Sequence, residues 1–306
     1  MAWFEGFDEG WHGVEGLRLF ARTGGRRGAP PLLLLHGYPQ THALWRRVAE
    51  RLAERFFLVL PDLRGYGRSD KPPGEADHAN YSKRAMAADV TVLMRSLGHE
   101  RFLVAGHDRG GRVAHRLALD HPQAVERLCV IDIVPTLTMY ERTDQAFATA
   151  YYHWFHLIQP APLPERHLGA DPAWHLRQTL GGWGSRGLGH VEPEALADYE
   201  AGFCAPPPHP GALPPGIHAA CEDYRAAAGI DLVHDRASRA AGEQVACPLH
   251  VLWGERGVVA RLFSPIQDWQ AVCRGPVSGR AMAAGHFIPE EAPEETAEEL
   301  GWVLGG

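Results

Sequence analysis

Short apolar runs alternate with helical and loop segments in the first and last parts of the chain. Five of these runs end at turn residues and have the length of buried strands: 32–35, 56–60, 102–105, 128–133 and 249–253. From Met86, apolar residues recur at i+4, i+7, i+8 and i+11, which predicts a helix over 82–97. Strands that alternate with helices are typical of a mostly parallel sheet, so we expect an α/β fold.

The alternation stops between about residues 135 and 239, where aromatic stretches and loops rich in proline and glycine replace it. The segment 205–215 alone holds six prolines. The pattern returns with the strand at 249, and an amphipathic helix over 293–304 is expected to end the chain. We therefore predict a core domain built from residues 1–135 and 240–306, with a helical cap domain inserted at 136–239.

Composition excludes several classes of partner. The chain has 306 residues, a formal charge of −7 and no long basic run, which argues against a nucleic-acid ligand. Its five cysteines form no C-x-x-C pair and fit a reducing cytoplasm. The early apolar run 30–35 is too short for a membrane span or a signal core. No H-x-x-x-H occurs, and the glycines after Asp108 belong to the turn there and do not make G-x-G-x-x-G, so we expect no metal and no cofactor.

The strongest chemical signal is Gly106-His107-Asp108-Arg109-Gly110, which follows a predicted strand and opens a helix. Small residues two before and two after the central position permit the sharp elbow that lifts a nucleophile above the sheet of an α/β hydrolase. Here the elbow residue is Asp108. The alternative interpretation is an ordinary turn in which the aspartate caps the helix.

A carboxylate nucleophile restricts the reaction. It can attack a saturated carbon, expel a leaving group and form an ester that water then hydrolyses, whereas attack on an amide or ester would give a labile anhydride. The second step needs a base, and the chain order of such hydrolases points to His286, in the loop after the last strand. The alternative for His286 is a histidine in a surface loop.

The acid that orients the histidine is displaced from its usual place. The strand at 249–253 runs into Trp253-Gly-Glu-Arg-Gly257, where a W-G-x-x-D pattern would put aspartate at 257. Asp132 stands at the end of the preceding strand, where a charged residue in an apolar run needs a partner. We assign Asp132 as the acid, with Glu255 as the fallback and a structural buried aspartate as the alternative.

Backbone and side-chain donors are expected around Asp108. The backbone N–H groups of Tyr38 and Arg109 would form the oxyanion site. The guanidinium groups of Arg109 and Arg112 lie one helical turn apart at a helix N-terminus, where they keep Asp108 ionised and offer bidentate sites for a substrate carboxylate. The alternative for Arg112 is an ion pair with a surface acid.

Six segments together resemble the fluoroacetate dehalogenases, the haloacetate dehalogenases of the α/β-hydrolase superfamily. They are H-G-Y-P-Q-T-H at 36–42, P-D-L-R-G-Y-G-R-S-D-K-P at 61–72, G-H-D-R-G-G-R-V-A-H-R at 106–116, Y-H-W-F at 152–155, C-E-D-Y-R-A at 221–226 and G-H-F-I-P-E-E at 285–291. The resemblance implies that His153, Trp154 and Tyr224 donate hydrogen bonds to the departing halide. It also implies a homodimer. Without the resemblance, the aromatic residues around His153 would be interpreted as the packed face of a helix.

The sequence therefore predicts hydrolytic dehalogenation of a small anionic 2-haloacid, such as fluoroacetate, by an ester intermediate on Asp108. The choice of fluorine comes from the resemblance alone. An epoxide hydrolase is the first alternative, because Tyr224 could instead protonate an epoxide oxygen. A non-catalytic protein that uses the two arginines to hold a carboxylate is the second.

Overall fold

A mostly parallel sheet of eight strands forms the centre of the molecule in the computed structural model, which describes residues 3–14 and 16–305. The strands are β1 (Phe7–Val14), β2 (Leu17–Gly25), β3 (Pro31–Leu35), β4 (Phe57–Pro61), β5 (Phe102–His107), β6 (Val125–Ile131), β7 (Leu249–Gly254) and β8 (Val277–Met282). Their order is β1-β2-β4-β3-β5-β6-β7-β8. Strand β2 is antiparallel to both β1 and β4, and the other neighbouring pairs are parallel. The predicted α/β-hydrolase architecture is confirmed.

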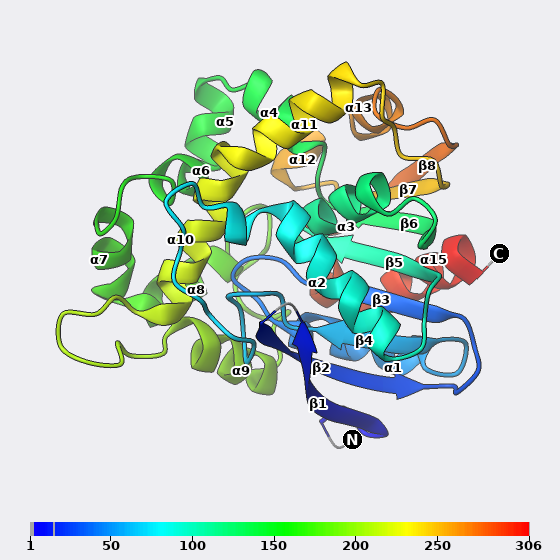
Figure 1. The fold of residues 1–306 in the computed structure, drawn as a ribbon, viewed down its shortest axis with the longest axis horizontal. Helices are drawn as coiled ribbons and strands as arrows, with labels where there is room; N and C mark the ends of the chain where they lie inside the picture. Colours follow the sequence, from blue (N-terminus) through cyan, green and yellow to red (C-terminus); the bar gives the residue numbers. More distant parts are fainter. Residues whose placement is uncertain (1–2, 15, 306) are drawn as a thin grey trace.

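Strand β3 shows why the sheet is buried on both faces. Its side chains alternate, so that Leu33 and Leu35 belong to one hydrophobic cluster, while Leu32 and Leu34 belong to another. The first cluster includes apolar residues of α2 (Lys83–Ser96) and α3 (Arg109–Asp120). The second includes residues of α1 (Arg46–Leu52) and α15 (Pro293–Gly305). Helices therefore cover both faces of the sheet (Figure 1).

The predicted elements of the core are present, with shifted ends. All five predicted strands exist, and the fourth is displaced toward the N-terminus, since β6 ends at Ile131 and leaves Asp132 beyond the strand. The predicted helix at 82–97 is α2, whose N-cap Ser82 accepts a hydrogen bond from the backbone N–H of Ala85 at 3.1 Å. The sequence pattern missed β1, β2 and β8. Two of these, β1 and β8, are the outer strands of the sheet and alternate exposed with half-buried residues, so neither is a continuous apolar run.

Between β6 and β7 the described residues form eight helices and no strand. They are α4 (Thr136–Glu141), α5 (Gln145–Ala150), α6 (Tyr152–His156), α7 (Leu163–Gly169), α8 (Pro172–Leu180), α9 (Pro193–Phe203), α10 (Pro215–Ala228) and α11 (Ile230–Ala240). We call this segment the insertion; Figure 1 draws it in green to yellow, to the left of and above the sheet. That it forms a separate cap domain stays a prediction.

The remaining helices are short and belong to connections around the sheet. They are the 3-10 helices η1 (His42–Trp45) and η2 (Ala79–Tyr81), and the α-helices α12 (Val258–Leu262), α13 (Pro265–Gln270) and α14 (Ile288–Glu291). None of the helices in the described part of the chain is both long and apolar enough to cross a membrane.

Candidate active site

Asp108 stands at the sharp turn between β5 and α3. Its backbone is strained, with φ 46° and ψ −115°, a conformation that aspartate rarely adopts. A Cβ atom on Gly106 would lie 2.5 Å from the carbonyl oxygen of Gly110, and one on Gly110 would lie 2.4 Å from that of His36. Only glycines fit at these two positions, as the elbow motif predicts. Within the described residues, the Asp108 side chain caps no N–H of α3, which rules out the capping alternative.

The Asp108 carboxylate faces the loop after β3. The backbone N–H of Tyr38 donates to Oδ2 of Asp108 at 3.0 Å. This approach depends on Gly37, because a Cβ atom there would lie 2.5 Å from the Cβ atom of Asp108. The Arg109 N–H belongs to the first turn of α3, where backbone N–H groups have no intrahelical acceptor. The Tyr38 N–H thus contacts the carboxylate, whereas the role of the Arg109 N–H stays a prediction.

His286 and Asp132 are in direct contact. The imidazole Nδ1 lies 2.6 Å from Oδ2 of Asp132, and the other carboxylate oxygen accepts the N–H of Gly254 at 2.9 Å. A Cβ atom at Gly257 would lie 3.3 Å from both Asp132 oxygens, so the carboxylate occupies the space that an aspartate at 257 would need. Glu255 is exposed. The fallback assignment is therefore wrong, and Asp132 is the acid that contacts the histidine.

Nearby charges lower the pKa of Asp108 and raise the pKa of His286. Burial raises the pKa of Asp108, but the charges of His286, Arg109 and Arg112 outweigh it, so the carboxyl pKa is lowered. Burial lowers the pKa of His286, and the hydrogen bond and charge of Asp132 reverse this to a raised pKa. With Nδ1 directed at Asp132, the other ring nitrogen of His286 is buried and has no partner among the described residues. The site therefore holds an ionised carboxylate near an imidazole with a free nitrogen.

The Arg109 side chain does not form the open fork that the sequence suggested. Its Nε donates to Oδ2 of Asp223 at 2.9 Å, and its Nη2 donates to Oδ1 at 2.7 Å and to the Asp223 carbonyl at 3.0 Å. Lys83 and Tyr66 also bind the Asp223 carboxylate. Only Nη1 of Arg109 lacks a partner within the described part of the chain. Asp223 was not among the predicted site residues, although it lies in the quoted C-E-D-Y-R-A segment.

Replacing Asp223 by asparagine should destabilise the protein strongly, because it leaves two buried cations, Arg109 and Lys83, without their anion. Removing one partner of a buried ion pair lowers the free energy of unfolding by about 3–5 kcal/mol. Urea denaturation of the variant measures this change. Asp77→Asn, at an exposed position, is the matched control. A loss of under about 1 kcal/mol, the range of surface pairs, would show that the network is not the one described.

Arg112 is a buried cation that pairs with no acid in the described residues. Its Nη1 donates to the carbonyl of Val134 at 3.2 Å and to Oγ1 of Thr136 at 3.0 Å, and its Nη2 lies 3.2 Å from the Met139 sulfur. Its Nε has no partner among the residues described. The guanidinium carbon sits 4.7 Å from the centre of the Trp154 ring. The surface ion-pair alternative for Arg112 is therefore wrong.

The three residues expected to bind halide lie together. The His153 ring centre is 5.6 Å from that of Tyr224, and the Trp154 ring centre is 6.4 Å from it. The guanidinium carbon of Arg109 sits 4.2 Å from the Tyr224 ring centre. Burial raises the pKa of Tyr224 well above its usual value and lowers that of His153 well below, so the first is a neutral phenol and the second a neutral imidazole. Within the described chain, the Tyr224 hydroxyl and the His153 Nδ1 have no partner.

Two further aromatic residues, Tyr151 and Trp183, line the same region and were not predicted. The Tyr151 ring centre lies 5.3 Å from that of His153 and 6.4 Å from that of His286. Trp183 lies 4.4 Å from His153 and 5.2 Å from His286, and its carbonyl accepts the His286 N–H at 3.2 Å. Tyr151 adjoins the quoted Y-H-W-F segment, whereas Trp183 lies in the glycine-rich stretch 181–189, which has no firm motif.

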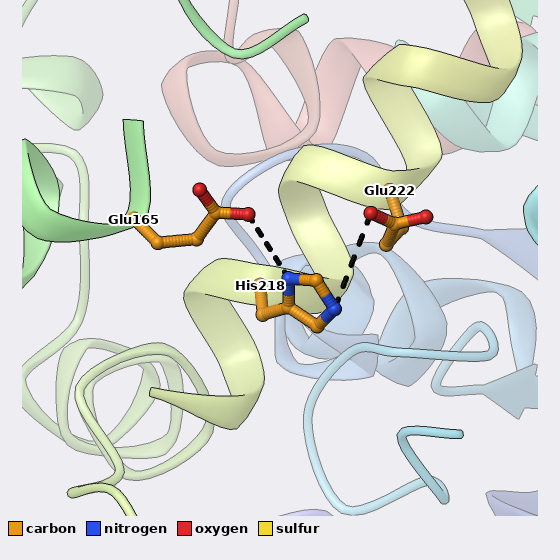
Figure 2. A group of neighbouring side chains, drawn as sticks. All are labelled: Glu165, His218 and Glu222. Atoms are coloured by element: carbon orange, nitrogen blue, oxygen red, sulfur yellow. Dashed lines mark hydrogen bonds and ion pairs between the residues drawn. The ribbon is translucent and has the colours of Figure 1, made fainter. Parts of the chain in front are cut away.

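A second cluster of titratable side chains lies in the insertion. Glu165 of α7 and His218 and Glu222 of α10 place one ligand atom each within 4.8 Å of one another (Figure 2). Arg225 enters the same cluster, since its Nη1 donates to both carboxylates at 2.7 Å. A divalent cation would meet the charge of this guanidinium. We interpret the group as an ionic contact between α7 and α10, and not as a metal site.

Comparisons with known proteins show the family of the chain. Residues 30–185 match the model of the alpha/beta hydrolase fold. A fluoroacetate dehalogenase from Burkholderia sp is 44% identical over 97% of this chain and 93% of its own, and a soluble epoxide hydrolase from Corynebacterium sp. is 30% identical over 92% and 91%. A solved structure from Nostoc sp PCC 7120, assigned to the α/β hydrolases, is 48% identical with a TM-score of 0.92, over 98% of this chain and 99% of that one. The chain therefore belongs to the α/β-hydrolase fold family and, within it, to the hydrolases that include the fluoroacetate dehalogenase of Burkholderia sp.

Proposed function

We propose that the chain hydrolyses the carbon–halogen bond of a small 2-haloacid, such as fluoroacetate, to the 2-hydroxy acid, halide and a proton. One observation carries this proposal: Arg112 is buried, pairs with no carboxylate in the described chain and has a free Nε beside the elbow. A buried cation needs an anion. Asp108 acts on this charge from nearby, and a substrate carboxylate would supply the directly bonded anion that the free Nε lacks. Such a carboxylate distinguishes a haloacid from a neutral haloalkane. The 44% identical relative named as a fluoroacetate dehalogenase supports the same class.

In the first step, an oxygen of Asp108 attacks the saturated carbon that bears the halogen, and the carbon–halogen electron pair leaves with the halide. Arg112 Nε and Arg109 Nη1 are free to hold the substrate carboxylate. Fluoride is a poor and strongly hydrated leaving group, so its departure demands several donors in a dry pocket. The imidazole of His153, the indole of Trp154 and the phenol of Tyr224 supply them.

In the second step, water hydrolyses the ester on Asp108. The free Nε2 of His286 takes a proton from water, and the hydroxide attacks the ester carbonyl. The bond from the carbonyl carbon to the substrate oxygen then breaks, this oxygen takes the proton of the added hydroxyl, and the 2-hydroxy acid leaves Asp108 as a carboxylate. The N–H groups of Tyr38 and Arg109 stabilise the oxyanion of the tetrahedral intermediate. Asp132 stabilises the imidazolium that forms, and the proton then passes to solvent. Because His286 must be neutral to act, activity should rise with pH through its raised pKa.

We further propose that the insertion acts as the cap of the site. It supplies His153, Trp154 and Tyr224 from α6 and α10, so closure of the insertion would exclude water from the reacting groups. Dimerisation and a cytoplasmic location stay predictions. The insertion exposes large apolar side chains, Tyr152, Leu163 and Trp174, that a second copy of the chain could cover. Light scattering of the purified protein measures the oligomeric state.

An epoxide hydrolase is the second candidate, and a specific observation favours it. The hydroxyl groups of Tyr151 and Tyr224 are both buried without a partner in the described residues, and both lie beside His153. Such phenols can protonate the oxygen of an opening epoxide. The relative named soluble epoxide hydrolase, 30% identical, points the same way. A neutral epoxide, however, supplies no carboxylate that could accept a hydrogen bond from the free Nε of Arg112.

A substrate panel separates the two functions. The wild-type protein is incubated with fluoro-, chloro- and bromoacetate and with styrene oxide, and free halide and diol are measured. We expect halide and glycolate from at least one haloacetate. The neutral haloacetamides serve as controls of matched size, and their turnover should be far slower because they lack the carboxylate. Diol without halide from any haloacetate would replace the proposal by the epoxide hydrolase.

Arg112→Lys should weaken haloacid binding while keeping a positive charge in the site. Lysine can reach one carbonyl or one substrate oxygen, but it lacks the planar fork that bonds Val134, Thr136 and the substrate together. A lost charge-assisted hydrogen bond corresponds to about 1.5–3 kcal/mol, or roughly a 10- to 100-fold rise in KM. Steady-state kinetics with chloroacetate measures it. An unchanged KM would mean that Arg112 does not bind the carboxylate.

A further inference from the structure

Two adjacent glutamates at 290 and 291 follow the loop of His286, and the mechanism above does not use them. Glu291 accepts hydrogen bonds from the backbone N–H groups of Gly285 at 2.8 Å and Phe287 at 3.1 Å, which flank His286 on both sides. Its carboxylate also pairs with Arg256 at 2.9 Å. Glu291 thus fixes the backbone that carries the proposed base.

Glu290 holds two other segments. Its Oε2 accepts the Gln40 amide Nε2 at 2.7 Å, and its Oε1 accepts the Tyr199 hydroxyl at 2.8 Å. Gln40 is part of the turn that carries Tyr38, and its backbone N–H closes that turn on the Gly37 carbonyl at 2.9 Å. Tyr199 belongs to α9 of the insertion. One buried carboxyl therefore connects the oxyanion turn, the insertion and α14, directly after the His286 loop.

We propose that Glu290 is a positioning residue that sets the place of the Tyr38 N–H relative to His286 and ties both to helix α9 of the insertion. The proposal rests on the proposed function, in which Tyr38 stabilises the oxyanion and His286 activates water. Glu290 itself touches no reacting atom. Its effect on the rate comes through the geometry of the ester-hydrolysis step, where small displacements of a donor change the rate strongly.

The protonation state of Glu290 follows from its surroundings. Burial raises its carboxyl pKa to about 8, although the Tyr199 hydrogen bond and the charge of Arg47 lower it. The charges of Glu192 and Glu291 raise the pKa further. Below about pH 8 the carboxyl is therefore a neutral acid that can donate one hydrogen bond as well as accept.

The Gln40 amide gives the neutral acid an acceptor. As placed, the amide oxygen of Gln40 is buried without a partner among the residues described. Exchange of the amide oxygen and nitrogen turns this oxygen toward Glu290, where the carboxylic acid can donate to it. When Glu290 is ionised, the Gln40 amide must face it with its nitrogen, because a carboxylate can only accept a hydrogen bond. Protonation of Glu290 and orientation of Gln40 are thus linked, and a glutamine at 290 reproduces the neutral state.

The test compares Glu290→Gln, Glu290→Ala and wild type by the pH dependence of kcat and KM for the most active haloacetate. We expect kcat of the wild type to fall above about pH 8 as Glu290 ionises, and the fall to be absent in Glu290→Gln. Glu290→Ala should lower kcat by about tenfold, with kcat/KM within about twofold, since the residue acts on the step after the ester has formed and does not touch the substrate. Glu295→Gln, exposed on α15, is the matched control and should behave as wild type.

An identical alkaline fall in Glu290→Gln and wild type, or an unchanged kcat in Glu290→Ala, would overturn the proposal. A second readout does not depend on activity. Native Glu290 keeps its proton up to about pH 8, whereas an unfolded glutamate loses it near 4.5, so the wild type should lose stability relative to Glu290→Gln as pH rises between these values. If no haloacetate is turned over but this difference in Tm appears, the proposed function fails while the buried neutral carboxyl stands; if the Tm difference is absent too, both fail.

Discussion

Asp108→Asn should abolish turnover of haloacids, with kcat/KM lowered by about 10⁴-fold or more. An amide oxygen is a far weaker nucleophile toward saturated carbon than a carboxylate, so the ester cannot form. The fold should survive, because the strained turn at 108 is set by the glycines around it, and asparagine tolerates positive φ. Halide release from chloroacetate measures the rate, and thermal unfolding measures the fold.

Asp8→Asn, an exposed exchange of the same chemistry, is the control for Asp108→Asn and should retain full activity. Binding of an unreactive carboxylate such as acetate separates catalysis from simple binding. We expect Asp108→Asn to bind acetate at least as tightly as wild type, since a negative charge is removed beside Arg112. If Asp108→Asn released halide at the wild-type rate, the nucleophile would have to be another residue. If neither protein released halide while both bound acetate, the chain would be a carboxylate-binding protein.

His286→Asn should stop the reaction after its first chemical step. Asparagine cannot take the proton of water, so general-base assistance worth about 10²–10⁴-fold is lost from ester hydrolysis. Attack of Asp108 on the haloacid needs no base and should continue. The variant is therefore expected to release one halide per active site in a burst and then almost none. Stopped-flow measurement of halide with a known enzyme concentration gives the size of this burst.

His209→Asn is the control for His286→Asn, because His209 is exposed on the loop before α10. It should show linear halide release at the wild-type rate. Continued multiple turnover by His286→Asn, at a rate near that of wild type, would mean that another group activates water. Absence of even the first burst would mean that His286 acts before the ester forms, as a single-step mechanism requires.

The sequence predicted the central strands and the elbow for clear physical reasons. Parallel strands covered on both faces are continuous apolar runs, as in β3, and the turn at Asp108 needs glycine at fixed positions. The position of Asp132 could be predicted because the usual acid is missing at Gly257, and a buried charge needs a partner. Strands β1 and β8 were not predicted, because outer strands with polar, half-exposed faces do not form continuous apolar runs.

The partners of the arginines could not be predicted in the same way. Arg109 and Arg112 look equivalent in the sequence, one helical turn apart, yet Asp223 forms an ion pair with the first while the second makes hydrogen bonds only to neutral groups. Asp223 lies over a hundred residues away on α10 of the insertion, and its approach depends on tertiary packing. The contact between Glu290 and Gln40 likewise depends on tertiary packing and could not be predicted from the local sequence. The local sequence pattern predicts which residue types stand at the ends of the strands, but it does not predict which distant charged residue they contact.

The central claim is that a haloacid alkylates Asp108. Mass spectrometry of His286→Asn after incubation with chloroacetate tests it most directly, first on the intact protein and then on its peptides. We predict a mass increase of one carboxymethyl group per chain, located on the peptide that contains Asp108 and lost on treatment with alkali, as an ester requires. An unmodified protein after halide release, or a carboxymethyl group on another residue, would contradict the account.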